Sequence, residues 1–100
     1  MSRSEFRWNK KRKHYAYLFK DCGKQVFSIV ISTKPYRMMH GKAKANIKLV
    51  RHPNPNCLKT AYLIPYVYVD ELLSFFDKVY RWNFDKNDKR KVKRIKRRLK

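Results

Sequence analysis

The stretch Gln25–Thr33, which reads Gln-Val-Phe-Ser-Ile-Val-Ile-Ser-Thr, decides the fold that this sequence predicts. It is rich in β-branched residues and has neither a charge nor a helix breaker, which is typical of a central strand. Phe27, Ile29 and Ile31 alternate toward one face, which suits a hydrophobic core. The other face carries the smaller and partly polar set Val26, Ser28, Val30 and Ser32.

The residues before this stretch predict its hairpin partner. His14–Lys20 alternates aromatic and other side chains in the manner of a strand, and Asp21–Lys24 is a short polar turn that contains Gly23. Residues 14–33 are therefore expected to form an antiparallel hairpin.

Two more strands are expected after the hairpin, at Asn46–Arg51 and Tyr62–Val69. Pro65 places the second of them at a sheet edge, because proline cannot donate a ladder hydrogen bond. Loops are expected at Lys34–Lys44 and at His52–Asn56, where two prolines exclude helix and interior strand.

The C-terminal third predicts two helices. Asp70 is a suitable N-cap for a helix whose apolar residues follow the i, i+3, i+4, i+7 pattern, namely Leu72, Phe75, Phe76 and Val79. A second helix begins near Asp85 and has a narrow apolar line formed by Val92, Ile95 and Leu99.

The expected fold is α+β: a small antiparallel sheet of about four strands, covered by one amphipathic helix and followed by a basic helix. Residues 1–13 are expected to be a flexible basic arm, residues 14–84 the core domain, and residues 85–100 the basic C-terminal helix.

Charge indicates the class of partner. The chain has 27 Lys and Arg against 7 Asp and Glu, a net charge of +20, and the cations are densest at the two ends. Such clusters are typical of nucleic-acid contacts. RNA is favoured over duplex DNA, since no helix-turn-helix or zinc-finger spacing is present. An acidic protein partner is the other possibility.

The sequence predicts a cytoplasmic protein that does not enter membranes. It begins without a signal-peptide pattern and has no apolar run of about 20 residues. Cys22 and Cys57 are far apart and are expected to be free thiols.

The expected nucleic-acid contacts are cations of the loops, third strand and last helix, together with tyrosines of the fourth strand. They are Lys34, Arg37, Lys42, Lys44, Lys48, Arg51, Tyr62, Tyr66, Arg90, Lys93, Arg94, Arg97 and Arg98. Exposed tyrosines allow bases to stack.

Metal-dependent catalysis is not expected, because the acids are scattered and the Cys and His residues lack paired spacing, so no metal or cofactor is predicted. RNA cleavage without metal needs a base, an acid and cations around the phosphate. The first candidates are His40, His52 and Lys34. Further candidates are His14, Tyr15, Arg37, Lys42 and Lys44, with Asn54 or Tyr62 in support.

Several short motifs carry a resemblance to a known family. They are Ile31-Ser32-Thr33, Asn46-Ile47-Lys48-Leu49, His52-Pro53-Asn54-Pro55, Ala61-Tyr62, and Trp82-Asn83-Phe84 with Asp88. Together they resemble short basic proteins of low-GC Gram-positive bacteria and their phages and mobile elements. That group is similar in outline to compact ribonucleases of the barnase, colicin and RelE-like kind. The resemblance implies metal-free RNA chemistry on a small antiparallel sheet.

The leading hypothesis is a nucleic-acid-binding protein that favours RNA. The alternatives are a metal-independent endoribonuclease of toxin or phage type and a small effector that binds an acidic protein. In a straight, fully paired sheet, His40 would group with Lys34, Lys42 and Lys44, while His52 and Asn54 would lie at the opposite end. One site that uses both histidines therefore requires a bend in the chain.

Overall fold

The computed structural model describes residues 2–98, and its centre is strand β3 (Gln25–Ser32). β3 pairs antiparallel with β2 (His14–Cys22) on one side and with β7 (Tyr62–Leu72) on the other. Ile29 and Ile31 are buried in the main core, and Val26 is buried in a second cluster on the opposite face. The predicted central strand and its hairpin with residues 14–22 are both confirmed.

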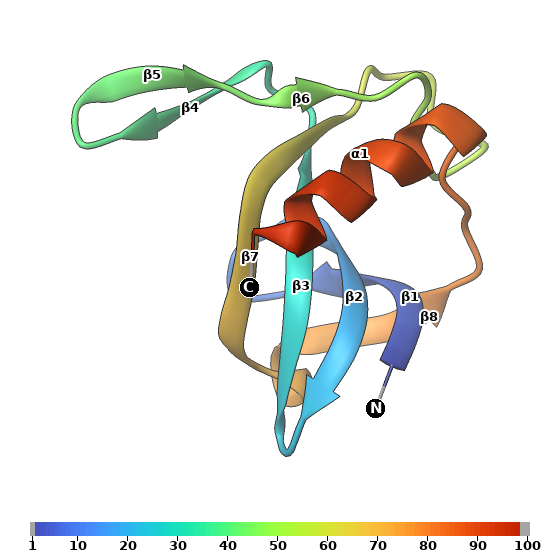
Figure 1. The fold of residues 1–100 in the computed structure, drawn as a ribbon. Helices are drawn as coiled ribbons and strands as arrows, with labels where there is room; N and C mark the ends of the chain where they lie inside the picture. Colours follow the sequence, from blue (N-terminus) through green and yellow to red (C-terminus); the bar gives the residue numbers. More distant parts are fainter. Residues whose placement is uncertain (1, 99–100) are drawn as a thin grey trace.

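Six strands form the main sheet, in the order β6-β7-β3-β2-β1-β8. The strands not yet given are β1 (Ser2–Asn9), β6 (Ile47–Lys48) and β8 (Phe76–Tyr80). A separate two-stranded ribbon consists of β4 (Tyr36–Met39) and β5 (Lys42–Ala45), and it projects away from the rest of the molecule (Figure 1). We call this ribbon, residues 36–45, the arm; it is distinct from residues 1–13, which the sequence predicted to be a flexible basic arm.

The main sheet curls strongly (Figure 1). In the run β7-β3-β2-β1-β8 the two outer strands are consecutive in the chain, joined only by the 3₁₀ turn η1 (Leu73–Phe75). Such a short link between outer strands requires the sheet to bend back on itself, as in a partly closed barrel. The concave face holds a small cluster with Ala16, Leu18, Val26 and Phe76 at its centre.

Helix α1 (Lys86–Arg97) crosses the other face of the sheet (Figure 1). Val92 and Ile95 are buried there among residues of β1, β2, β3 and β7, which together form the main core. The side chain of Asp85 caps the helix by accepting a hydrogen bond from the Asn87 N–H at 2.9 Å. The predicted C-terminal helix is thus confirmed, whereas Leu99 lies outside the described residues.

The prediction of a flexible arm at residues 1–13 is wrong for Ser2–Asn9. These residues form β1, which pairs with both β2 and β8, and Phe6 is buried against Tyr17 and Phe84. Arg3 bridges Glu5 and Asp21 at 2.7 and 2.6 Å. The charged residues of this segment suggested a flexible arm, but the half-buried Arg3 and Arg7 are paired with nearby acids, which lets the segment form a strand.

The predicted helix at residues 70–79 is also wrong. β7 continues through Leu72, the chain turns at η1, and β8 then pairs with β1. Of the four residues in the supposed apolar stripe only Phe76 is buried, while Leu72 and Val79 are exposed. The edge of β1 has backbone groups that need a partner strand. Pairing of β8 with this edge therefore outweighs the helical spacing of apolar residues in the 70–79 segment.

The segment between β3 and β7 differs as well. Residues predicted as a loop, Lys34–Lys44, contain most of the arm, and the predicted strand Asn46–Arg51 shortens to Ile47–Lys48. Leu49 is nevertheless buried, and its N–H donates to the Ala61 carbonyl at 2.9 Å. An antiparallel sheet with one C-terminal helix is therefore confirmed. The protein has more strands than expected and one α-helix instead of two.

In the part of the chain that the structure describes, no helix has the length and apolar character needed to cross a membrane.

Candidate nucleic-acid interface

The arm has two chemically different faces. Directly paired residues of antiparallel strands share a face, and the pairs are Tyr36 with Ala45, Arg37 with Lys44, Met38 with Ala43, and Met39 with Lys42. One face is therefore apolar, and the other carries three cations and a methionine. His40 and Gly41 form the tip, with φ angles of 51° and 77°, which is the geometry of a two-residue hairpin turn that favours glycine.

The base of the arm is held in place by a hydrogen-bond network. Arg37 Nη1 donates to the Ala45 carbonyl at 2.8 Å and to Asn46 Oδ1 at 3.0 Å. Asn46 Nδ2 in turn donates to the Lys34 carbonyl at 3.0 Å. The guanidinium of Arg37 is thus fixed at the root of the cationic face, which reduces the ordering cost of a ligand contact.

A groove of about 580 Å³ lies between the arm and β7. We call it the arm groove, and it is lined by Arg37, Met38, Met39, His40, Ile64, Pro65, Tyr66 and Tyr68. Tyr66 is 53% exposed, and its ring meets that of Tyr68 edge-on with centroids 4.8 Å apart. The other side of this aromatic pair is closed by Arg12, whose guanidinium lies 3.9 Å from the centre of the Tyr68 ring.

The arm groove continues toward the end of α1. A neighbouring hollow of about 460 Å³ shares Pro65 and Tyr66 with it and also includes Ile95 and Arg98. Arg98 Nη1 donates to the Pro65 carbonyl at 3.3 Å. The exposed Tyr66 is therefore common to a hollow lined by Arg37 of the arm and a hollow lined by Arg98 of the helix end, and no carboxylate is among the lining residues.

Two cations of α1, Lys91 and Lys96, are half-buried, and the others are exposed. Lys91 donates to Asp88 Oδ1 at 3.0 Å and to the Lys48 carbonyl at 2.8 Å, and Lys96 lies 4.8 Å from the centre of the Phe19 ring. Burial, and then Lys93, lower the pKa of Lys96. The helix cations predicted to contact nucleic acid are instead exposed: Arg90, Lys93, Arg94, Arg97 and Arg98.

None of the predicted contact cations is in an ion pair among the side chains that the structure describes. The ion pairs there use Arg3, Arg7, Lys10, Arg12 and Lys91. Lys34, Lys42, Lys44, Lys48 and Arg51 are all exposed. The acids of those ion pairs lie in β1, β2, β7, β8 and α1.

The loop between β6 and β7 is tied to the helix by a fully buried carboxylate. Asp88 Oδ1 and Oδ2 accept from the Val50 N–H at 2.8 and 3.1 Å, and Oδ2 accepts from the Arg51 N–H at 3.4 Å. The Asp88 residue is 0% exposed. This anchor bends the chain back across the end of the sheet, so the loop does not simply continue the line of β6.

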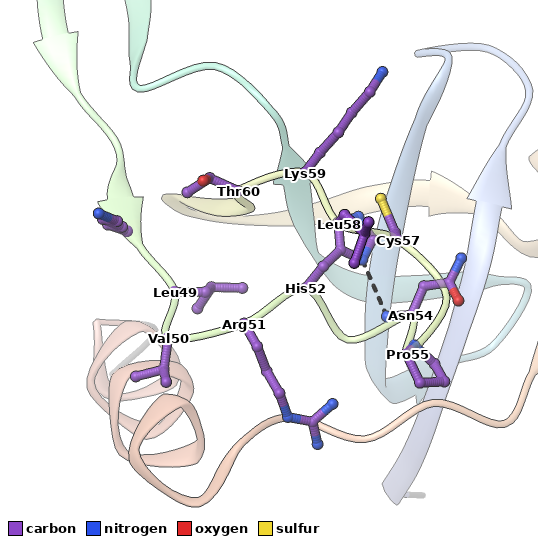
Figure 2. Close-up of a pocket in the computed structure, with 11 residues that line it drawn as sticks. Leu49, Val50, Arg51, His52, Asn54, Pro55, Cys57, Leu58, Lys59 and Thr60 are labelled. Atoms are coloured by element: carbon purple, nitrogen blue, oxygen red, sulfur yellow. Dashed lines mark hydrogen bonds between the residues drawn. The ribbon is translucent and has the colours of Figure 1, made fainter.

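His52 lies inside this loop and is only 6% exposed. Its Nδ1 accepts a hydrogen bond from the Asn54 N–H at 3.0 Å, as Figure 2 shows. Its ring packs edge-on against Tyr15 and Trp82, and burial lowers its pKa. Figure 2 shows the hollow of about 520 Å³ between the two limbs of the loop, from which Lys59 and Arg51 extend in different directions.

A second hollow, of about 320 Å³, lies on the other side of His52. We call it the histidine hollow, and its lining residues are Trp8, Lys13, His14, Tyr15, Ile31, Thr33, His52, Cys57 and Lys59. Burial, followed by Lys34 and Arg12, lowers the pKa of His14. His14 and His52 thus line one hollow together with two lysines.

The three residues predicted to be catalytic are not brought together. His40 lies at the arm tip and lines the arm groove, whereas His52 lines the histidine hollow. Lys34 is exposed between β3 and β4, and its N–H donates to Ser32 Oγ at 3.1 Å. The chain does bend as a site with two histidines would require. The bend brings His52 to the same hollow as His14 and Thr33, however, and not to His40.

The remaining predicted contacts are placed by β6 and β7. Lys48 pairs with Tyr62, which is half-buried, while Asn54 serves the loop by accepting from the Asn56 N–H at 3.0 Å. No signal in the sequence indicates that Lys13 and Lys59 line the histidine hollow. Sequence reasoning also missed the arm, although the alternation Lys42-Ala43-Lys44-Ala45 after a His-Gly turn was a signal for it.

The lowered histidine pKa values predict that the folded state loses stability on mild acidification. The unfolded chain binds more protons than the native chain just below pH 6.5, so the free energy of unfolding falls as pH falls through this value. We expect the urea midpoint to be lower at pH 5.5 than at pH 7.5. Replacing both His14 and His52 by Gln flattens this dependence, and a wild-type midpoint that is constant over the range contradicts the assignment.

Among residues 2–98, no group of three or more His, Cys, Asp or Glu side chains could hold a metal ion. No protein-family model matches this chain, and no curated protein or solved structure is significantly similar to it.

Proposed function

We propose that this protein binds single-stranded nucleic acid, with RNA favoured, along the arm groove. The observation that carries this proposal is the position of Tyr66, an exposed ring shared by two adjoining hollows, one lined by Arg37 of the arm and the other by Arg98 at the end of α1. Aromatic rings accept unpaired bases of any sequence, and flanking cations bind the backbone phosphates.

The geometry favours a single strand over a duplex. Only an unpaired base can turn its face onto Tyr66, since bases inside a helix are already stacked. Arg37 of the arm and Arg98 at the end of α1 line the two adjoining hollows that share Tyr66, which suits a flexible backbone that passes from one hollow to the other. The net charge of +20 adds a general attraction for polyanions.

The test is an anisotropy titration at low salt with a labelled 12-nucleotide single-stranded RNA. The same sequence as single-stranded DNA and as duplex RNA completes the set. We expect saturable binding, with the single strands bound more tightly than the duplex. Equal or tighter binding of the duplex contradicts the groove, and absence of binding by every probe contradicts the proposed function.

Tyr66→Ala is predicted to weaken single-stranded RNA binding by about 1–3 kcal/mol, the usual contribution of one stacked base. Tyr36→Ala is a matched control, because Tyr36 is 61% exposed but does not line the arm groove. We expect the control to bind like the wild type. Equal losses in the two variants would place the stacked base outside the arm groove.

Metal-independent RNA cleavage is a second candidate function, and the pair of histidines in one hollow favours it. Burial lowers the pKa of both histidines, which favours neutral rings. A neutral His14 can accept the proton of a 2′-hydroxyl, whereas His52, whose Nδ1 accepts from the Asn54 N–H, can only donate from Nε2. Incubation of labelled RNA with EDTA separates the candidates. Cleavage that persists supports the enzyme, and retention of intact RNA supports the binding protein.

A protein-binding effector remains as the outcome in which RNA is neither bound nor cut. The apolar face of the arm is the surface that it would use, since Tyr36 and Met38 there are 61% and 70% exposed.

A further inference from the structure

The histidine hollow has an unusual lining, because nearly all of its polar groups can donate hydrogen bonds. Lys13, Lys59, His14 and Thr33 surround it, and no Asp or Glu is among its lining residues. Trp8 and Tyr15 form an aromatic wall, with ring centroids 4.8 Å apart. A hollow with cations, hydroxyls and no carboxylate selects for an anion.

His52 contributes a hydrogen-bond donor to this hollow. It is 6% exposed, and Nδ1 is occupied by the Asn54 N–H, so in the neutral ring the proton is on Nε2. Within residues 2–98 the Asn54 contact is the one hydrogen bond of this side chain, which leaves Nε2–H without a partner. Nε2 is accessible, because Asn9 Nδ2 is the one fully buried side-chain nitrogen or oxygen without a partner in the described residues, so a ligand can reach the Nε2–H donor.

The positive charge of the lining indicates which anion fits. A backbone phosphodiester presents two free oxygens and one negative charge, whereas a terminal phosphomonoester presents three oxygens and carries nearly two charges at pH 7. The two lysines of the hollow match the nearly two charges of a monoester better than the single charge of a diester. The volume of about 320 Å³ also leaves room for the adjoining sugar or base against Trp8 and Tyr15.

From this lining we infer that the histidine hollow binds the phosphomonoester at the end of a nucleic-acid strand, held by His52 Nε2–H, His14, Thr33 and Lys59. This inference rests on the proposed function only for its ligand class, since the residues of the hollow and those of the arm groove are different. It gives the protein a preference for strand ends that bear phosphate.

The strand test compares four RNAs of one sequence, with phosphate or hydroxyl at the 5′ end and at the 3′ end. At one of the two ends, we expect the RNA with a phosphate to bind about tenfold more tightly than the RNA with a hydroxyl at the same end. This is the usual effect of a charge-assisted hydrogen bond. Lys59→Met and His52→Phe are expected to remove this preference while binding of hydroxyl-ended RNA stays unchanged. Lys24→Met, in the exposed β2–β3 turn, is the matched control and keeps the preference.

His52→Phe also removes the acceptor of the Asn54 N–H, so it can disturb the loop. Lys59→Met avoids this difficulty, because the Lys59 side chain is exposed and makes no hydrogen bond among the described side chains. Equal affinity for phosphate and hydroxyl ends overturns the inference. A preference that survives Lys59→Met and His52→Phe together overturns it as well.

A mononucleotide separates this inference from the proposed function. We expect uridine 5′-monophosphate, but not uridine, to shift the NMR signals of the His14 and His52 rings. If these shifts occur and no strand binds, the hollow is supported and the arm-groove proposal fails. If strands bind and neither the mononucleotide nor the terminal phosphate has an effect, the hollow alone is refuted.

Discussion

Single-stranded RNA should be released from this protein by a modest rise in salt. Each phosphate contact releases a condensed counterion, and for single strands the slope of log K against log salt is about −0.7 per contact. If about six of the exposed cations are engaged, affinity falls by roughly 10²–10³ between 50 and 200 mM salt. Anisotropy titrations at four salt concentrations measure this slope directly.

The arm cations should account for a definite part of that slope. Lys42 and Lys44 lie on the cationic face and have no ion-pair partner within residues 2–98. The double variant Lys42→Ala, Lys44→Ala should reduce the slope by about 1.4, which is 0.7 for each lost contact. Lys20→Ala with Lys24→Ala, near the far end of the β2–β3 hairpin, removes the same charge and should leave the slope nearly unchanged. Equal slopes in the two double variants would mean that general charge, and not the arm, attracts the strand.

Asp88→Ala is expected to reduce the free energy of unfolding by about 3–5 kcal/mol, the range for breaking a buried ion pair. The substitution leaves the Val50 and Arg51 N–H groups without an acceptor and Lys91 without its carboxylate. It also frees the loop that carries His52. Urea denaturation followed by circular dichroism measures the loss.

Two comparisons make the Asp88 prediction specific. Asp85→Ala, which removes the helix N-cap, should cost about 1 kcal/mol, so a loss of similar size at both positions would argue against the buried anchor. Asp88→Asn retains one acceptor oxygen and should lie between the two alanine variants. Because the anchor positions the loop, the preference for phosphate ends should fall with Asp88→Ala even under conditions in which the variant is folded.

Local patterns predicted those parts of the fold in which one physical signal dominates. Alternation in Gln25–Thr33 gave the central strand, and the cap at Asp85 with Val92 and Ile95 gave the helix. At Leu72–Val79 a helical period coincided with residues that a curled sheet uses as strand, turn and strand. Only the open edge of β1, which lies far away in the sequence, decides between these structures.

The candidate sites depended even more on distant parts of the chain. Tyr66 and the arm cations could be named from the sequence, because exposed aromatics and lysines suit nucleic acid wherever they lie. The meeting of His52 with His14 could not, since it requires the Asp88 carboxylate to hold the loop back over the sheet. Asp88 had a sufficient local explanation as a first-turn acid, so its contact with Val50 gave no sequence signal.

The most direct test of the arm groove is an NMR titration of the ¹⁵N-labelled protein with unlabelled single-stranded RNA. We predict that the largest shift changes occur in Arg37–Lys44 and in Pro65–Tyr68, with smaller ones at the C-terminal end of α1. The exposed strand β8 should change little. Changes spread evenly over every cationic surface, or concentrated outside the arm and β7, would contradict the account.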